Sequence, residues 1–136
     1  MGSTVVAYAY DGAQGKLEEL QTLSTLPQDF REDNTGADIH VHPSGKFLYT
    51  SNRGHDSVVA FWIDLETGRL QRRAISPLGG VFPRDFAFTP DGQFIVVGHK
   101  LSNEVAVYAF DAATGAMTQV ANTIPMVKPL CFVFAT

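Results

Sequence analysis

Apolar residues occur at every second position in several short segments of the chain, and a period of two residues is typical of β-strands. Residues 38–42 and 85–89 show the alternation most clearly. Each leads into a turn, residues 42–45 and 89–92, that contains a proline and a glycine. Proline presets φ and glycine supplies a positive φ, so both turns favour a hairpin. No helical stripe of useful length interrupts the pattern, and we predict an all-β chain.

The same pattern occurs more than once in the chain. Residues 37–52, ADIHVHPSGKFLYTSN, align without a gap with residues 84–99, RDFAFTPDGQFIVVGH, at an offset of 47 residues. The N-terminal residues from Val5 onward match those from Val58 onward at an offset of 53. The C-terminal residues from Pro129 onward match those from Pro83 onward at an offset of 46. A β pattern that repeats at this length predicts the blades of a propeller.

A five-residue turn also occurs in three copies, at Asp11–Gly15, Asp64–Gly68 and Asp111–Gly115, and each copy leads to a further strand. The predicted fold class is an all-β propeller segment of four-stranded antiparallel blades, with two full blades and two partial blades. The single domain, residues 1–136, divides into a partial blade with its connection at 4–36, a blade at 37–82, a blade at 83–128 and the first strand of a further blade at 129–136.

This division places both ends of the chain inside blades. An arc of blades leaves an apolar face at each end and open strand edges, because each blade buries its faces against its neighbours. We therefore expect either a piece of a longer protein or several copies that close a ring together. In a ring of copies, Leu130–Phe134 of one copy would lie beside Val5–Tyr10 of another, in a heterologous interface.

The composition narrows the function classes. Hydrophobic residues make up 45% of the 136 residues, which is a globular composition. The net charge of −4 and a pI near 5.4 argue against a nucleic-acid partner. The longest apolar runs are too short to span a membrane. One cysteine, Cys131, fits a reducing compartment, and we expect a cytoplasmic protein.

Two segments carry a family resemblance: residues 37–61, ADIHVHPSGKFLYTSNRGHDSVVAF, and residues 83–100, PRDFAFTPDGQFIVVGHK. They resemble the C-terminal part of the lactonase family of seven-bladed propellers, which includes bacterial propeller-type 6-phosphogluconolactonases and relatives of the fungal carboxymuconate-lactonizing enzyme. The end of the chain, MVKPLCFVF, resembles the strand that closes the ring in that family. The resemblance implies hydrolysis of a sugar lactone, with a phosphosugar lactone as substrate and no cofactor.

The resemblance also implies a set of site residues. Opening a lactone ring needs a base that activates water and a donor that stabilises the oxyanion. His40 would be the base, and Asp38 would set its tautomer or act itself. Cationic side chains suit a phosphate group. The substrate-binding candidates are Arg53, Arg84 and Lys100.

Each candidate has a structural alternative. Asp38 repeats as Asp85, which favours a structural task such as bonding the backbone of a neighbouring blade. Arg53 and Lys100 repeat in charge, so exposed loop cations are an equal explanation. His40 does not repeat, and Arg84 is replaced in the next copy, which favours specific roles for both.

A metal site and a catalytically silent chain are also open interpretations. A histidine follows two residues after His40 on the same strand face, but no third ligand has a suitable spacing, and we expect no metal site. The alternative to the enzyme is a propeller segment without activity that assembles with copies of itself, because a fold by analogy does not establish a function.

Overall fold

The computed structural model describes residues 2–135, which form strands and no helix. In this range, accordingly, there is no helix that could cross a membrane. The strands are β1 (Thr4–Asp11), β2 (Lys16–Ser24), β3 (Thr35–Val41), β4 (Phe47–Arg53), β5 (Ser57–Ile63), β6 (Leu70–Pro77), β7 (Pro83–Phe88), β8 (Phe94–His99), β9 (Glu104–Phe110), β10 (Met117–Gln119) and β11 (Ile124–Pro125).

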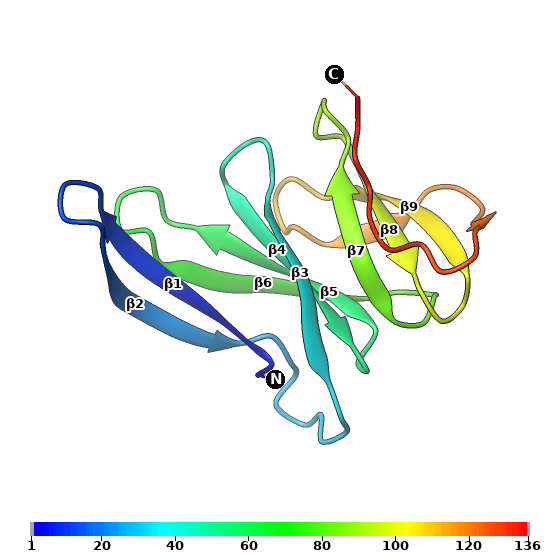
Figure 1. Ribbon diagram of the computed structural model, residues 1–136, viewed down its shortest axis with the longest axis horizontal. Helices are drawn as coiled ribbons and strands as arrows, with labels where there is room; N and C mark the ends of the chain where they lie inside the picture. Colours follow the sequence, from blue (N-terminus) through cyan, green and yellow to red (C-terminus); the bar gives the residue numbers. More distant parts are fainter. Residues whose placement is uncertain (1, 136) are drawn as a thin grey trace.

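The strands form three antiparallel sheets. β1 and β2 make an N-terminal hairpin, β3 to β6 make the first full blade, and β7 to β10 make the second full blade, in which β11 also pairs with β9. The sheets follow one another in chain order, from the blue hairpin to the yellow and orange blade (Figure 1). This arrangement confirms the predicted fold class.

The two full blades share one apolar core. The side chains of β4 and β5 that face the second blade meet those of β7, β8 and β9, and nearly all are inaccessible to solvent. Burial of an apolar side chain contributes about 1.5–3 kcal/mol, so this interface is the main source of stability. Its members are Phe47, Tyr49, Val58, Ala60, Phe86, Ile95, Val97, Ala106 and Tyr108.

A smaller core joins the N-terminal hairpin to the opposite face of the first blade. Val5 of β1 packs with Leu48, Val59 and Phe61, all buried. Since the two faces of β4 and β5 contact different sheets, these strands are buried on both sides, unlike the mostly exposed β1 and β2.

The predicted five-residue turns have one geometry in all three copies. Asp11, Asp64 and Asp111 each accept two backbone N–H bonds on Oδ1, at 2.8–3.2 Å. These backbone donors hold the pKa of Asp64 and of Asp111 below the ordinary value. The glycine that ends each turn has a positive φ, between 63° and 75°. The aspartate and the glycine therefore explain why the motif repeats.

The first blade has an uncovered inner edge. Phe86 and Phe88 of β7 pack against the first blade, and Phe86 is fully buried. The corresponding residues of β3, Ile39 and Val41, are 52% and 54% exposed. The N-terminal hairpin covers only the outer strands β4 to β6 through the smaller core. An apolar surface on β3 therefore has no cover within the described residues.

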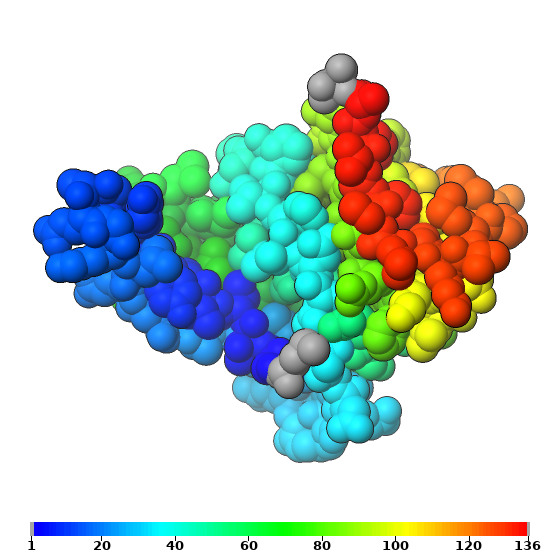
Figure 2. Space-filling model, in the orientation of Figure 1, coloured from blue at the N-terminus to red at the C-terminus, as the bar shows by residue number. Residues whose placement is uncertain are grey.

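The C-terminal segment differs from the predicted strand at 129–136. Residues 126–135 pair with no strand in the part of the chain that the structure describes, and Thr136 lies outside that part. A strand needs a partner for its ladder, and none is present there. The segment instead lies along the second blade, beside β7 (Figures 1 and 2). The Phe132 ring closely approaches Gly98, where an added Cβ would be 2.9 Å from it.

Candidate functional site

Asp38 connects the two full blades. The register of β3 against β4 shifts between Gly36 and Ile39, and such a bulge re-aims a side chain. Asp38 Oδ2 accepts the backbone N–H of Phe86 at 3.1 Å. The repeated residue does the same in the next copy, where Asp85 Oδ2 accepts the N–H of Phe132 at 2.8 Å. Asp38 and Asp85 therefore both bond the backbone of the next repeat, which is the structural role that the repetition of this residue favoured.

The same carboxylate also holds His40. Oδ2 of Asp38 lies 2.9 Å from His40 Nε2, and the side chains are 20% and 45% exposed. The edge of the imidazole packs against the Phe86 ring, with 5.0 Å between centroids. A carboxylate accepts the proton of Nε2 and so selects the tautomer whose Nδ1 is a base. His40 and Asp38 therefore form a pair that suits proton transfer.

Asp85 joins this pair from the neighbouring strand. Burial raises the pKa of Asp85, and the negative charge of Asp38 raises it further. Since β3 and β7 are in contact and the charges of Asp38 and His40 both act on Asp85, we refer to these three side chains as the acidic group. Sequence reasoning identified Asp85 only as the repeat of Asp38, because the distance between two innermost strands is not visible in the alternation of residues.

Two of the three predicted cations, Arg53 and Lys100, lie over one aromatic ring. The guanidinium of Arg53 lies 5.1 Å from the centre of the Phe82 ring, and Lys100 Nζ lies 5.8 Å from it. Arg53 Nη2 also donates to the Gly36 carbonyl at 2.8 Å. Burial lowers the pKa of Arg53, and the positive charge of Arg84 lowers it further. Three positive charges without a carboxylate partner in the described residues form a site that favours an anion.

The cations lie on the strands of the acidic group, or on or directly after the strands paired with them. Thr35 of β3 pairs with Arg53, and Asp38 follows three residues later. At about 3.3 Å per residue the separation along the strand is about 10 Å. On β7, Arg84 directly precedes Asp85. The backbone therefore places the cations within a few residues of the acidic group.

Phe82 is the member of this site that sequence reasoning missed. Its ring lines a pocket with Arg53 and Gly54 and with the connection residues Asp33, Asn34 and Thr35. The available signal was its position directly before Pro83, where the next copy of the repeat has Lys128 before Pro129. That signal does not reveal which cations the ring would meet.

The other histidine of β3 and its hairpin turn is structural. His42 Nε2 bonds the Gly92 carbonyl and Nδ1 bonds Ser44 Oγ, both at 2.8 Å, while the ring packs against Phe110 with 4.3 Å between centroids. Both nitrogens are therefore occupied and cannot bind a metal together with His40. Across residues 2–135, no three His, Cys, Asp or Glu side chains are grouped to hold a metal ion.

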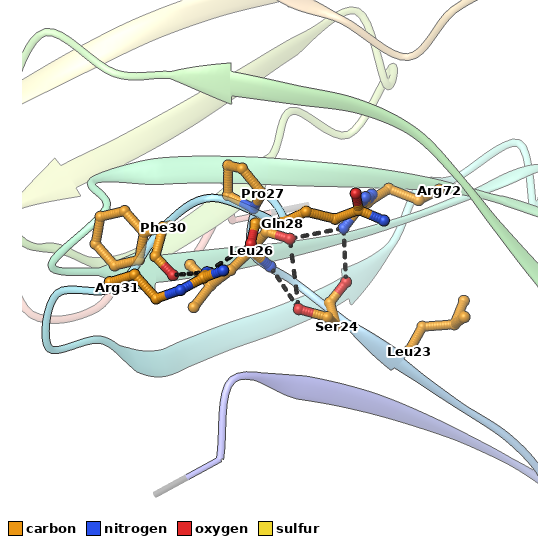
Figure 3. A pocket seen from close by; sticks show the side chains of 8 residues that line it. All are labelled: Leu23, Ser24, Leu26, Pro27, Gln28, Phe30, Arg31 and Arg72. Atoms are coloured by element: carbon orange, nitrogen blue, oxygen red, sulfur yellow. Dashed lines mark hydrogen bonds between the residues drawn. The ribbon is translucent and has the colours of Figure 1, made fainter.

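A second pocket lies between the hairpin and the outer strand of the first blade (Figure 3). Two arginines point into it, but Arg72 Nη1 donates to the Ser24 and Leu26 carbonyls, at 3.2 and 2.8 Å, and Arg31 Nη1 donates to the Gln28 and Phe30 carbonyls. Both guanidinium groups therefore hydrogen-bond the backbone at and after the end of β2 and stabilise that connection. The lining, Leu23, Ser24, Leu26, Pro27, Gln28, Phe30, Arg31 and Arg72, contains none of the predicted site residues.

Comparisons with known proteins agree with this architecture. The family described as "Lactonase, 7-bladed beta-propeller" matches residues 1–134. The 6-phosphogluconolactonase of Bacillus subtilis is 32% identical over 134 residues, which is 98% of this chain and 38% of that protein. The 6-phosphogluconolactonase of Formosa agariphila is 43% identical over 111 residues, which is 80% of this chain and 31% of that protein.

A solved structure shows the same fold. The periplasmic gluconolactonase of Pseudomonas aeruginosa superposes with a TM-score of 0.89 at 30% identity, over 95% of this chain and 36% of that one. The chain spans about a third of the length of these proteins, and the match extends over nearly all of its own blades and turns. On this evidence the chain belongs to the lactonase family of seven-bladed β-propellers.

Proposed function

We propose that this chain carries the water-activating and phosphate-binding parts of a lactonase that hydrolyses 6-phosphogluconolactone or a closely similar sugar lactone. The observation that supports this most strongly is the Asp38–His40 pair on the strand that also pairs with Arg53. Two similar proteins are named 6-phosphogluconolactonases, and a third is named a gluconolactonase. The specific lactone, and activity in a chain of this length, are part of the proposal.

The proposed reaction uses His40 as a base and then as an acid. Nδ1 takes a proton from water while Nε2–H stays bonded to Asp38, and the water oxygen forms a bond to the lactone carbonyl carbon. The carbonyl electrons move to oxygen, and Arg84 stabilises the resulting oxyanion. When the carbonyl re-forms, the ring C–O bond breaks and the leaving oxygen takes the proton from His40. Arg53 and Lys100 bind the phosphate.

Replacement of His40 tests this mechanism. His40→Asn keeps an N–H donor near Asp38 but removes the base, so we expect kcat for 6-phosphogluconolactone to fall about 10²- to 10⁴-fold. The loss of lactone, followed by NMR against a buffer blank, measures the rate. His55→Asn is the matched control, because His55 bonds Ser57 and is outside the proposed site. Decay no faster than in buffer, or an unchanged rate in His40→Asn, refutes the proposal for this chain.

A second candidate is a catalytically silent propeller segment that assembles with copies of itself. The exposed Ile39 and Val41 favour it, since Phe86 and Phe88 at the corresponding positions are packed against a blade. Copies would place Leu130–Phe134 of one chain near Val5–Tyr10 of the next, and the two chains would then share the surroundings of the proposed site. Light scattering after size exclusion tests assembly, and a clean monomer of 14.8 kDa contradicts it.

We also propose a cytoplasmic location, because the single cysteine, Cys131, is exposed and has no disulfide partner. The similar P. aeruginosa protein is named periplasmic, so the compartment needs its own measurement. Fractionation of cells that produce the protein, with immunodetection in each fraction, would decide between the two compartments.

A further inference from the structure

Phe82 has an unusual backbone conformation for an aromatic residue. Its φ is +65°, in the left-handed region that bulky residues rarely adopt. Lys128, at the corresponding position before Pro129, has a φ of +48°. The backbone N–H of Phe82 donates to Asp56 Oδ1 at 2.9 Å, and that of Lys128 donates to Asn103 Oδ1 at 3.0 Å. The backbone conformation therefore belongs to the connection between blades, and only the side chain is particular to position 82.

In this conformation the Phe82 ring lies close to two cations of the proposed site. Arg53 and Lys100 lie 5.1 and 5.8 Å from the ring centre. The backbone of Lys100 also bonds that of Phe82, since the Lys100 N–H donates to the Phe82 carbonyl at 3.0 Å. An aromatic face attracts cations without neutralising them, as a carboxylate would. The two charges thus stay available to an anionic ligand.

The ring is also accessible. Phe82 is partly exposed and lines the pocket that Arg53 and Thr35 share. Binding sites for small molecules combine such apolar surfaces with a few placed polar groups. The apolar C–H face of a sugar ring can stack on an aromatic ring, while its phosphate pairs with a guanidinium in a bidentate way. The pocket offers both surfaces together.

We propose that Phe82 determines specificity by stacking against the sugar ring of a phosphorylated lactone whose phosphate lies between Arg53 and Lys100. This inference rests on the proposed function and adds to it a subsite for the sugar ring. It predicts that the ring of Phe82 contributes to binding of the sugar and contributes little to binding of phosphate alone.

Equilibrium binding separates this proposal from the catalytic one. The hydroxy acid product, 6-phosphogluconate, is a stable probe, and inorganic phosphate is the second probe. For Phe82→Leu we expect the Kd for 6-phosphogluconate to rise about tenfold, as for loss of an aromatic contact, and the Kd for phosphate to change less than twofold. Phe82→Tyr keeps the ring and should restore the affinity for 6-phosphogluconate.

Three outcomes overturn the inference. If Phe82→Leu binds 6-phosphogluconate as the unaltered chain does, the ring makes no contact with the sugar. If affinity for phosphate falls as much as affinity for 6-phosphogluconate, Phe82 only positions Arg53 and Lys100. If Phe82→Tyr binds as weakly as Phe82→Leu, the aromatic face is not the cause. All three leave the effect of His40→Asn on hydrolysis unaltered, so the two proposals fail separately.

Discussion

At the scale of single residues, Asp38 shows how one carboxylate serves the fold and the candidate chemistry together. Its Oδ2 accepts the N–H of Phe86 and also contacts His40 Nε2. A substitution of Asp38 would therefore disturb the junction of the blades and the tautomer of the histidine at once. His40 is the more informative residue to replace, because its side chain is 45% exposed and bonds Asp38 alone among the described residues.

His99 is a residue whose environment predicts a dependence of stability on pH. It is fully buried, both ring nitrogens lack a partner within residues 2–135, and it occupies the position of Asn52 in the repeat. Burial lowers the pKa of His99 below the ordinary 6.5, although Glu104 and Asp56 oppose the shift. The unfolded chain therefore takes up a proton more readily than the folded chain, and stability should fall as the pH drops below about 6.5.

We expect His99→Gln to be less stable at pH 8, because the site is closely packed, but to lose less of its stability between pH 7 and 5. Urea unfolding at both pH values measures this, with His55→Gln as the matched histidine control. A variant that is as acid-sensitive as the unaltered chain would mean that another group causes the sensitivity.

At the scale of the elements, the turns of one blade dock on the strands of the blade before. The Gly115 carbonyl accepts the hydroxyl of Tyr49 at 3.0 Å, and burial raises the pKa of Tyr49. An added Cβ at Gly115 would be 2.9 Å from Ala60 Cβ. In the first copy of the turn, Gly15 has a similar φ of +63°, but a Cβ there would meet no atom within 4 Å.

This contrast separates backbone strain from packing. Gly15→Ala should cost about 1 kcal/mol for the positive φ alone. Gly115→Ala carries the same strain and adds a clash with packed side chains, so its free energy of unfolding should fall by about 1–3 kcal/mol more. Chemical denaturation of both variants gives the two values. Equal losses would show that the docked turn relaxes without cost.

At the scale of the whole molecule, the main question is what covers the inner edge of the first blade. Apolar residues that are buried in one copy of a repeat and exposed in another indicate an absent neighbour. Ile39 and Val41 are such residues, and the N-terminal hairpin covers only the outer strands beside them. Three similar proteins are about three times as long as this chain.

If the proposed assembly between copies uses this edge, Ile39→Ser with Val41→Ser should weaken it while hardly changing the melting temperature of the monomer, because both side chains are already half exposed in it. Light scattering should then show a shift toward 14.8 kDa. Leu65→Ser is the control, since Leu65 is 72% exposed in a turn. An assembly that the double variant leaves unchanged would show that this edge is not the contact.

The sequence by itself determined the all-β fold, the repeat and the hairpin turns, and it offered the structural role of Asp38 as one of two interpretations. These features follow from a period of two residues, from turn residues with restricted φ and from comparison of one copy with the next, all of which are local. It also named five of the seven side chains described at the candidate site; the other two are Asp85 and Phe82.

Only the tertiary structure decided which of these side chains meet. The packing of one blade on the next brings Asp85 close enough for the charges of Asp38 and His40 to act on it, and it brings Arg53 and Lys100 to the Phe82 ring. The same packing occupies both nitrogens of His42, a residue that the strand pattern could not tell from His40. Distances between blades depend on how sheets stack, and no spacing along a single strand encodes them.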